Sequence, residues 1–168
     1  MLLSLHRDDA TVSRAGITSE VIDLPPAGDD HDAMTTTANE TTTAVIDGYL
    51  AAYGEPDADV RGVRIEAVWA PDGRLLDPPA AGEGHVGIDG LATALQGQFP
   101  GHRFRRTSAV DAHHDHVRFT WELVAPDGTP VLAGMDVGRL GRDGRLEQIV
   151  GFFGELPAAR TDGDAGPR

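Results

Sequence analysis

Four strand-like runs in the second half of the chain constrain its fold more than any other feature. They cover residues 102–112, 116–124, 130–140 and 145–154, and two of the breaks between them carry Asp-Gly pairs. Such pairs suit tight β-hairpins. In the run 116–124, apolar residues at every second position alternate with polar ones, which is typical of a sheet with one apolar face. The sequence therefore predicts an antiparallel sheet built from successive hairpins.

Three helical stretches are expected before this sheet. The first begins near residue 41, where apolar residues recur at helical spacing up to Tyr53, and it ends at Gly54 and Pro56. The second is predicted over residues 59–69, followed by a turn at 71–73 and a short strand at 74–77. The third covers residues 88–99. Helices packed on a hairpin-rich sheet indicate an α+β domain, and a curved sheet wrapped by helices leaves a cavity on its concave side.

The ends of the chain differ from this core in composition. Residues 1–39 show no sustained period and contain Asp29, Asp30 and Asp32 followed by a Thr-rich stretch, so they are expected to be a disordered acidic leader. Met34 is an alternative start, and the sequence leaves that choice open. The domain is placed at residues 40–156, and residues 157–168 are expected to form a flexible tail.

Composition excludes several classes of function. A formal net charge of -13 argues against binding to nucleic acid, which needs clustered Lys and Arg. There is no run of about 18 apolar residues that could span a bilayer, and no signal-peptide pattern at the start. We therefore expect a cytoplasmic protein without membrane contact. Because the chain has no cysteine, disulfides and thiolate metal sites are excluded.

Three short motifs carry a resemblance to a known superfamily. They are Val45-Ile46-Asp47-Gly48-Tyr49, the segment ending in Leu76-Asp77-Pro78, and Leu132-Ala133-Gly134-Met135-Asp136. Together, residues 41–156 resemble the NTF2-like superfamily, in particular bacterial ketosteroid isomerases and SnoaL-like polyketide cyclases. The resemblance implies a cystatin-like cone, in which three N-terminal helices pack on a curved antiparallel or mixed β-sheet and enclose a pocket.

The resemblance also implies roles for three polar residues. Asp77 would be the catalytic base, and Tyr49 and Asp136 would donate hydrogen bonds to a substrate oxygen. Moving a proton next to a carbonyl needs such a base and such donors. Asp136 can donate only if apolar surroundings keep it protonated, and Leu132, Gly134, Gly138 and Leu140 on its strand face supply them. The expected substrate-binding wall is Trp69, Trp121, Phe119, Ile149 and Phe153.

The function expected on this basis is that of a cofactor-free acid/base enzyme. Its substrate would be an apolar ketone or polyketide-like small molecule, enolised on the way to double-bond isomerisation or aldol-type ring closure. One alternative is a non-catalytic small-molecule-binding or dimerisation module. Another is epoxide opening, which calls for an Asp-Arg-Asp arrangement that no arginine here obviously completes. The superfamily also suggests a homodimer through the outer sheet face.

A cluster of possible metal ligands lies between two of the predicted strands. It consists of Asp111, His113, His114, Asp115 and His116. A hairpin turn exposes such side chains to solvent, so the cluster is interpreted as the polar residues of a turn, and no metal site is predicted.

Overall fold

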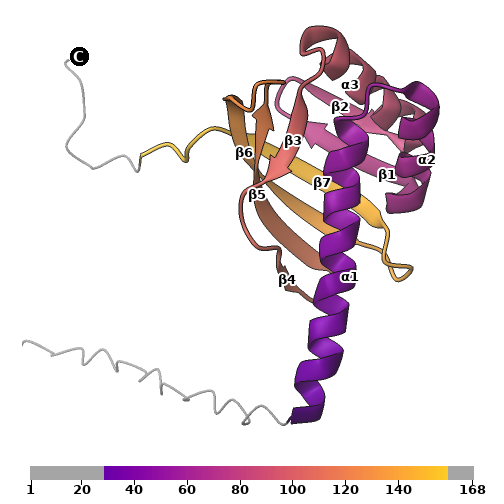
Figure 1. Cartoon of the computed structure of the whole chain (residues 1–168). Helices are drawn as coiled ribbons and strands as arrows, with labels where there is room; N and C mark the ends of the chain where they lie inside the picture. The colour runs from indigo at the N-terminus through magenta and orange to yellow at the C-terminus, as the bar shows by residue number, and fades with distance from the viewer. Residues whose placement is uncertain (1–28, 159–168) are drawn as a thin grey trace, which may run out of the picture.

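The computed structural model describes residues 29–158, with side chains from Asn39 onward. Along the chain, its elements are α1 (Asp29–Tyr53), α2 (Ala58–Val68), β1 (Trp69–Asp77), β2 (Ala80–Glu83), α3 (Gly84–Gln98), β3 (Arg103–Arg106), β4 (Asp111–His113), β5 (His116–Val124), β6 (Pro130–Leu140) and β7 (Leu146–Phe153). The three helices pack on one open, mixed sheet, and α1 crosses its face (Figure 1). The predicted α+β class is confirmed.

The sheet combines hairpins with one parallel pair. Its strand order is β2-β1-β7-β6-β5-β3, and β4 pairs with β5 beside β3. The pairs β5–β6 and β6–β7 are antiparallel, as the Asp-Gly turns predicted. The pair β1–β7 is parallel and joins strands that are far apart in the sequence. This pair places the end of β1 beside the last strand, next to the middle of the sheet.

The three helices do not all precede the sheet, as the resemblance implied, but follow the order predicted from the residues, with a strand before the third helix. α3 lies after β1 and β2, because the β1–β2 hairpin leads the chain back before α3 packs against both strands. β1 is also longer than predicted and begins at Trp69. The turn residues 71–73 lie inside it, where the register with β7 shifts between Trp69 and Arg74. A strand irregularity therefore explains the turn-like sequence.

Two other element boundaries differ from the prediction. The predicted strand 102–112 is two short strands, β3 and β4, because residues 107–110 leave the ladder. α1 begins at Asp29, so residues 29–39, which were assigned to a disordered leader, are helical, and this end of α1 projects beyond the sheet (Figure 1). Extending a formed helix adds one hydrogen bond per residue without a new nucleation cost. The remaining leader, 1–28, and the tail from 159 lie outside the described residues.

The core lies between the helices and one face of the sheet. Buried residues come from all three helices and from the central strands, among them Ile46, Ile65, Ile88, Leu123 and Ile149. The inward residues of β5 are those that the alternation predicted. No helix in the described part of the chain is long and apolar enough to cross a membrane.

Two helical glycines offer a test of this packing. A Cβ on Gly62 in α2 or Gly90 in α3 would meet nothing within 4 Å beyond its own helix, and neither residue has a positive φ. We expect Gly62→Ala and Gly90→Ala each to raise the free energy of unfolding by about 0.5–1 kcal/mol, because alanine restricts the unfolded chain and favours the helix. Urea unfolding measures this. Gly73→Ala, whose Cβ would lie 2.7 Å from the Trp69 ring, is the contrasting variant and is expected to destabilise. Lower stability in both helical variants would contradict the packing.

Candidate functional site

Three neighbouring strands bring Asp77 and Asp136 together on the helix-covered face of the sheet. In the β6–β7 register Asp136 is opposite Gly151. In the parallel β1–β7 register Leu76 pairs with Val150, so Asp77 comes beside Gly151 from the other side. A Cβ on Gly151 would overlap Oδ1 of Asp77 and lie 3.3 Å from Oδ1 of Asp136. The missing side chain of Gly151 therefore provides the space in which the two carboxyl groups approach each other.

Asp136 is buried and accepts two hydrogen bonds from different elements. The Tyr49 hydroxyl of α1 donates to its Oδ2 at 3.0 Å, and the Trp121 indole N–H of β5 donates to its Oδ1 at 2.7 Å. Only 1% of Asp136 is exposed. The structure thus joins Tyr49 and Asp136, which the sequence analysis had paired, and adds Trp121, which it had placed in the wall.

Asp77 has a hydrogen-bond partner that sequence reasoning missed. The Tyr53 hydroxyl donates to its Oδ2 at 3.1 Å. Tyr53 follows Tyr49 by one helical turn, so the two rings lie on the same side of α1 and stack with centroids 6.1 Å apart. The four-residue spacing of two tyrosines on one apolar stripe was the available signal, but it was interpreted as core packing. Each carboxyl group therefore has its own tyrosine.

The two carboxyl groups are in different electrostatic surroundings. The pKa of Asp136 is raised from 3.8 to about 7. Burial is the main cause, the bonds from Trp121 and Tyr49 oppose the rise, and the nearby Asp77 carboxylate adds to it. Burial also raises the pKa of Asp77, which is only half-buried, while the bond from Tyr53 lowers it. No Lys, Arg or His among the described residues bonds to either group. The site consequently holds acidic groups without a compensating cation.

Aromatic rings surround these groups. Trp69 and Phe119 contact the Tyr49 ring edge-on, at centroid distances of 5.7 and 6.4 Å. Trp121 contacts Phe153 edge-on at 5.6 Å. Ile149 is buried on β7, two residues before Gly151, whereas Phe153 is 37% exposed. The structure gathers the expected wall residues around the carboxyl groups, with Phe153 at the rim.

The described structure does not show the predicted ligand-sized pocket at this place. The internal space lined by Tyr49, Tyr53 and Trp69 leaves no room for even a water molecule, whereas ligand sites usually enclose about 300–1,000 Å³. The Trp69 indole, which is fully buried, is one of the side chains that enclose this space. The site is closed in this conformation.

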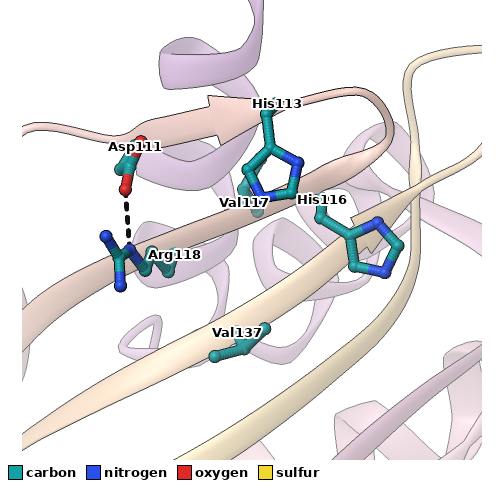
Figure 2. Close-up of a pocket in the computed structure, with 6 residues that line it drawn as sticks. All are labelled: Asp111, His113, His116, Val117, Arg118 and Val137. Carbon is teal, nitrogen blue, oxygen red and sulfur yellow. Dashed lines mark hydrogen bonds and ion pairs between the residues drawn. The ribbon is translucent and has the colours of Figure 1, made fainter. Parts of the chain in front are cut away.

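A separate hollow lies on the opposite face of the sheet, around the histidine cluster. Figure 2 shows Asp111 and His113 of β4 facing His116 and Arg118 of β5, with Val137 of β6 below. Arg118 donates to Asp111 at 2.7 Å, and both side chains are exposed. Within residues 29–158, no group of three or more His, Cys, Asp or Glu side chains is placed to hold a metal ion.

The raised pKa of Asp136 has a consequence for stability. Because the folded state holds this proton more tightly than the unfolded state, the stabilisation is fully present below about pH 4 and is lost as the pH rises to about 7. We expect Asp136→Asn to remove this dependence. Between pH 5 and pH 8 the unmodified protein should lose on the order of 2 kcal/mol more unfolding free energy than the variant. Urea titrations at both pH values measure the difference, and equal losses would contradict the assigned burial.

Comparisons with known proteins identify the family and the fold. The model of the SnoaL-like domain matches residues 46–149. A SnoaL-like protein from Agrobacterium tumefaciens, a proposed isomerase, is 36% identical, with 69% of this chain and 99% of that one covered and a TM-score of 0.65. A SnoaL-like protein from Jannaschia, a proposed polyketide cyclase, is 20% identical over 70% and 85%, with a TM-score of 0.53. A ketosteroid-isomerase-like protein from Catenulispora acidiphila, solved with trimethylamine, is 17% identical over 64% and 83%, with a TM-score of 0.51. No curated protein matches the chain.

Proposed function

The chain belongs to the SnoaL-like domain family, and on that premise we propose that its site is a cofactor-free acid/base centre. The substrate is an uncharged, apolar ketone or polyketide-like molecule, which the site enolises. The observation that carries the proposal is the pair of carboxyl groups flanking Gly151 in unequal surroundings. Two titratable groups whose environments separate their proton affinities are the arrangement that acid/base chemistry requires.

In this mechanism Asp77 is the base. Its Oδ2 accepts from Tyr53, while its Oδ1 faces the space over Gly151 and is the oxygen offered to the substrate. Asp77 removes a proton from the carbon next to the carbonyl, and the C–H electron pair moves to form an enolate. The burial that raises the pKa of Asp77 makes it a stronger base than an exposed aspartate.

Tyr49 and protonated Asp136 form the donor pair: one of their two O–H hydrogens joins them, and the other donates to the enolate oxygen. Both residues are buried, so hydrogen bonds to a developing negative charge are stronger here than in water. The proton held by Asp77 then returns to a different carbon, which completes a double-bond isomerisation. In a ring closure, the enolate carbon instead attacks a second carbonyl of the same molecule. Both outcomes share the first step.

Ligand entry requires the site to open. Asp77 and Phe153 are its more exposed members, so the rim between β1 and β7 is the side from which a ligand enters. Phe153 is the last residue of β7, and its outward shift would uncover the Trp121 ring that it contacts. Two buried indoles in place of smaller side chains favour a compact or flat substrate.

A non-catalytic binding module is the second candidate. The buried acid groups among aromatic rings favour it, since such rings attract ammonium ligands. The Catenulispora protein solved with trimethylamine has this fold. Epoxide opening receives no such support, because Arg106, the register partner of Trp121, is held by Asp47 at 2.8 Å.

We also propose a homodimer through the outer sheet face. Phe152, which is 50% exposed, pairs there with Met135, and Val150 pairs with Val137 on the same face. These residues form an apolar patch that a second copy would bury. Equilibrium sedimentation at micromolar concentration measures the association.

Solvent exchange tests the enolisation directly. The protein is incubated in buffered D₂O with a panel of uncharged cyclic and β,γ-unsaturated ketones, and proton NMR follows deuterium incorporation next to the carbonyl. We expect incorporation above the protein-free rate for at least one member. Saturable binding across the panel without any incorporation would support the binding module instead.

A further inference from the structure

The two oxygens of Asp136 have different kinds of hydrogen-bond partner. Oδ1 accepts from the indole N–H of Trp121 at 2.7 Å, and Oδ2 accepts from the hydroxyl of Tyr49 at 3.0 Å. An indole N–H can only donate, whereas a hydroxyl can donate or accept. Oδ1 is therefore always an acceptor here, and the exchangeable position of the carboxyl group is Oδ2.

We propose that Trp121 is a positioning residue, which reserves Oδ1 of Asp136 as an acceptor and thereby directs the acid proton to Oδ2, beside the Tyr49 hydroxyl. The hydrogen-bond assignment stands on geometry alone, but its consequence for catalysis rests on the proposed function. An Oδ1 that carried the proton would be a weaker acceptor for the indole N–H, whose nitrogen lies 2.7 Å away, so that arrangement is disfavoured. Trp121 acts through Asp136 and does not contact reacting atoms in this role.

A count of hydrogens shows what a proton on Oδ2 provides for a bound ligand. Protonated Asp136 and Tyr49 together carry two O–H hydrogens, and the contact between Oδ2 and the hydroxyl uses one of them. The second hydrogen is left to donate to a ligand oxygen. With a proton on Oδ1 instead, Oδ2 would only accept, and the tyrosine hydrogen would remain committed to it. Trp121 thus keeps one acidic donor available at the place where Tyr49 and Asp136 meet.

The indole is held firmly enough for this role. Gly134 of β6 is the register partner of Trp121, and a Cβ there would lie 2.5 Å from the indole ring, so the glycine is required for the ring to lie flat against β6. Phe104 and Phe153 contact the ring edge-on at 5.1 and 5.6 Å. A donor fixed by packing on three sides needs no reorganisation when the charge of Asp136 changes.

Few charged or titratable groups influence the titration of the Asp136 carboxyl group. The titratable groups that act on Asp136 are Tyr49 from α1 and Asp77 from β1, and Tyr53 bonds to Asp77 behind them. Its cross-strand neighbours on β5 and β7 are Phe119 and Gly151, which carry no charge. A shift in the pKa of Asp136 after Trp121 is replaced is therefore attributable to the lost N–H bond, provided that a matched variant controls for ring size.

Trp69 supplies that control. The chain has two tryptophans, and Trp69 is as deeply buried as Trp121. Its indole N–H, however, finds no hydrogen-bond partner among the described residues. Trp69→Phe and Trp121→Phe thus remove the same atoms from the same core, and only the second removes a bond to Asp136.

The test uses nitrogen-15 and carboxyl carbon-13 NMR of the full chain without substrate. We expect the Trp121 indole signal, identified by its loss in Trp121→Phe, to titrate with a midpoint near pH 7 together with the Asp136 carboxyl carbon. The Trp69 signal should stay constant. Trp121→Phe should raise the proton affinity of Asp136 on the order of tenfold, because the charged form loses a donor, whereas Trp69→Phe should leave it unchanged.

Two outcomes would overturn the assignment. One is a Trp121 signal that stays constant while Asp136 titrates. The other is an Asp136 midpoint that moves equally in both phenylalanine variants, which would make ring volume the cause. Neither outcome depends on turnover, so a failure here is distinguishable from a failure of the enolisation assay. If both tryptophan variants were unfolded, the indole titration of the unmodified protein and its absence in Asp136→Asn would still decide.

Discussion

Replacing Asp77 with asparagine is expected to slow deuterium exchange into a responsive ketone on the order of 10³-fold, because an amide cannot accept the proton that the mechanism transfers. Ligand binding should persist, since the amide has nearly the same shape and can still accept the bond from Tyr53. The result would therefore appear in the rate of the bound complex rather than in its dissociation constant. Proton NMR of the ketone measures the rate.

The matched control for this variant is Asp72→Asn. Asp72 lies on the same strand but is exposed and outside the site, so its loss should leave exchange unchanged. An Asp77→Asn protein that exchanges as fast as the unmodified one would remove Asp77 as the base. In that case the half-buried position of Asp77 would be a structural feature of the β1 end.

Replacing Asp136 with leucine should lower the same exchange rate by about 10²- to 10³-fold, the usual effect of losing an oxyanion donor. Replacement with asparagine should lower the exchange rate much less, since its amide still donates a hydrogen bond. Leucine also leaves the donors of Tyr49 and Trp121 buried without an acceptor, which destabilises the fold. Urea unfolding of each variant separates this effect from catalysis. Equal rates in the leucine and asparagine variants would contradict a donor role.

The sheet was largely predictable because its signals are local. The alternation in β5 correctly placed Val117, Phe119, Trp121 and Leu123 on the buried face, and Asp-Gly pairs correctly placed the β5–β6 and β6–β7 hairpins. Each of these signals lies within about ten residues of the structure it specifies. The resemblance to SnoaL-like proteins, carried by three short motifs, was confirmed by the family match.

The geometry of the site depended on contacts that no local pattern records. Asp77 meets Asp136 only because β1 and β7 pair in parallel, across more than half of the described chain. The helical stripe placed Tyr53 in the core but did not show that its hydroxyl reaches Asp77. Alternation likewise turned Trp121 inward without showing that its N–H ends on Asp136. Predicting a hydrogen bond between two elements requires knowing how those elements pack against each other, as well as which face each residue occupies.

The closed pocket was unpredictable for a different reason. Its volume is the small difference between the space enclosed by helices and sheet and the side chains that fill it. Trp69 and Trp121 were recognised as wall residues, but whether two indoles leave a cavity depends on ring orientation. The start of α1 at Asp29 is a similar case, since a Thr-rich segment has weak helix propensity and is helical here as an extension of a packed helix.

The most direct test of the account is the ionisation state of Asp136 in the unmodified, ligand-free protein. A carbon-13 titration of the carboxyl groups, assigned with Asp136→Asn, follows it without any substrate. The account predicts a pKa near 7, raised by burial and by the neighbouring Asp77, so that a large share of molecules carries the acid proton at neutral pH. An Asp136 that titrates near 3.8, the ordinary value for an aspartate, would leave no acidic donor at this position and would contradict the proposed mechanism.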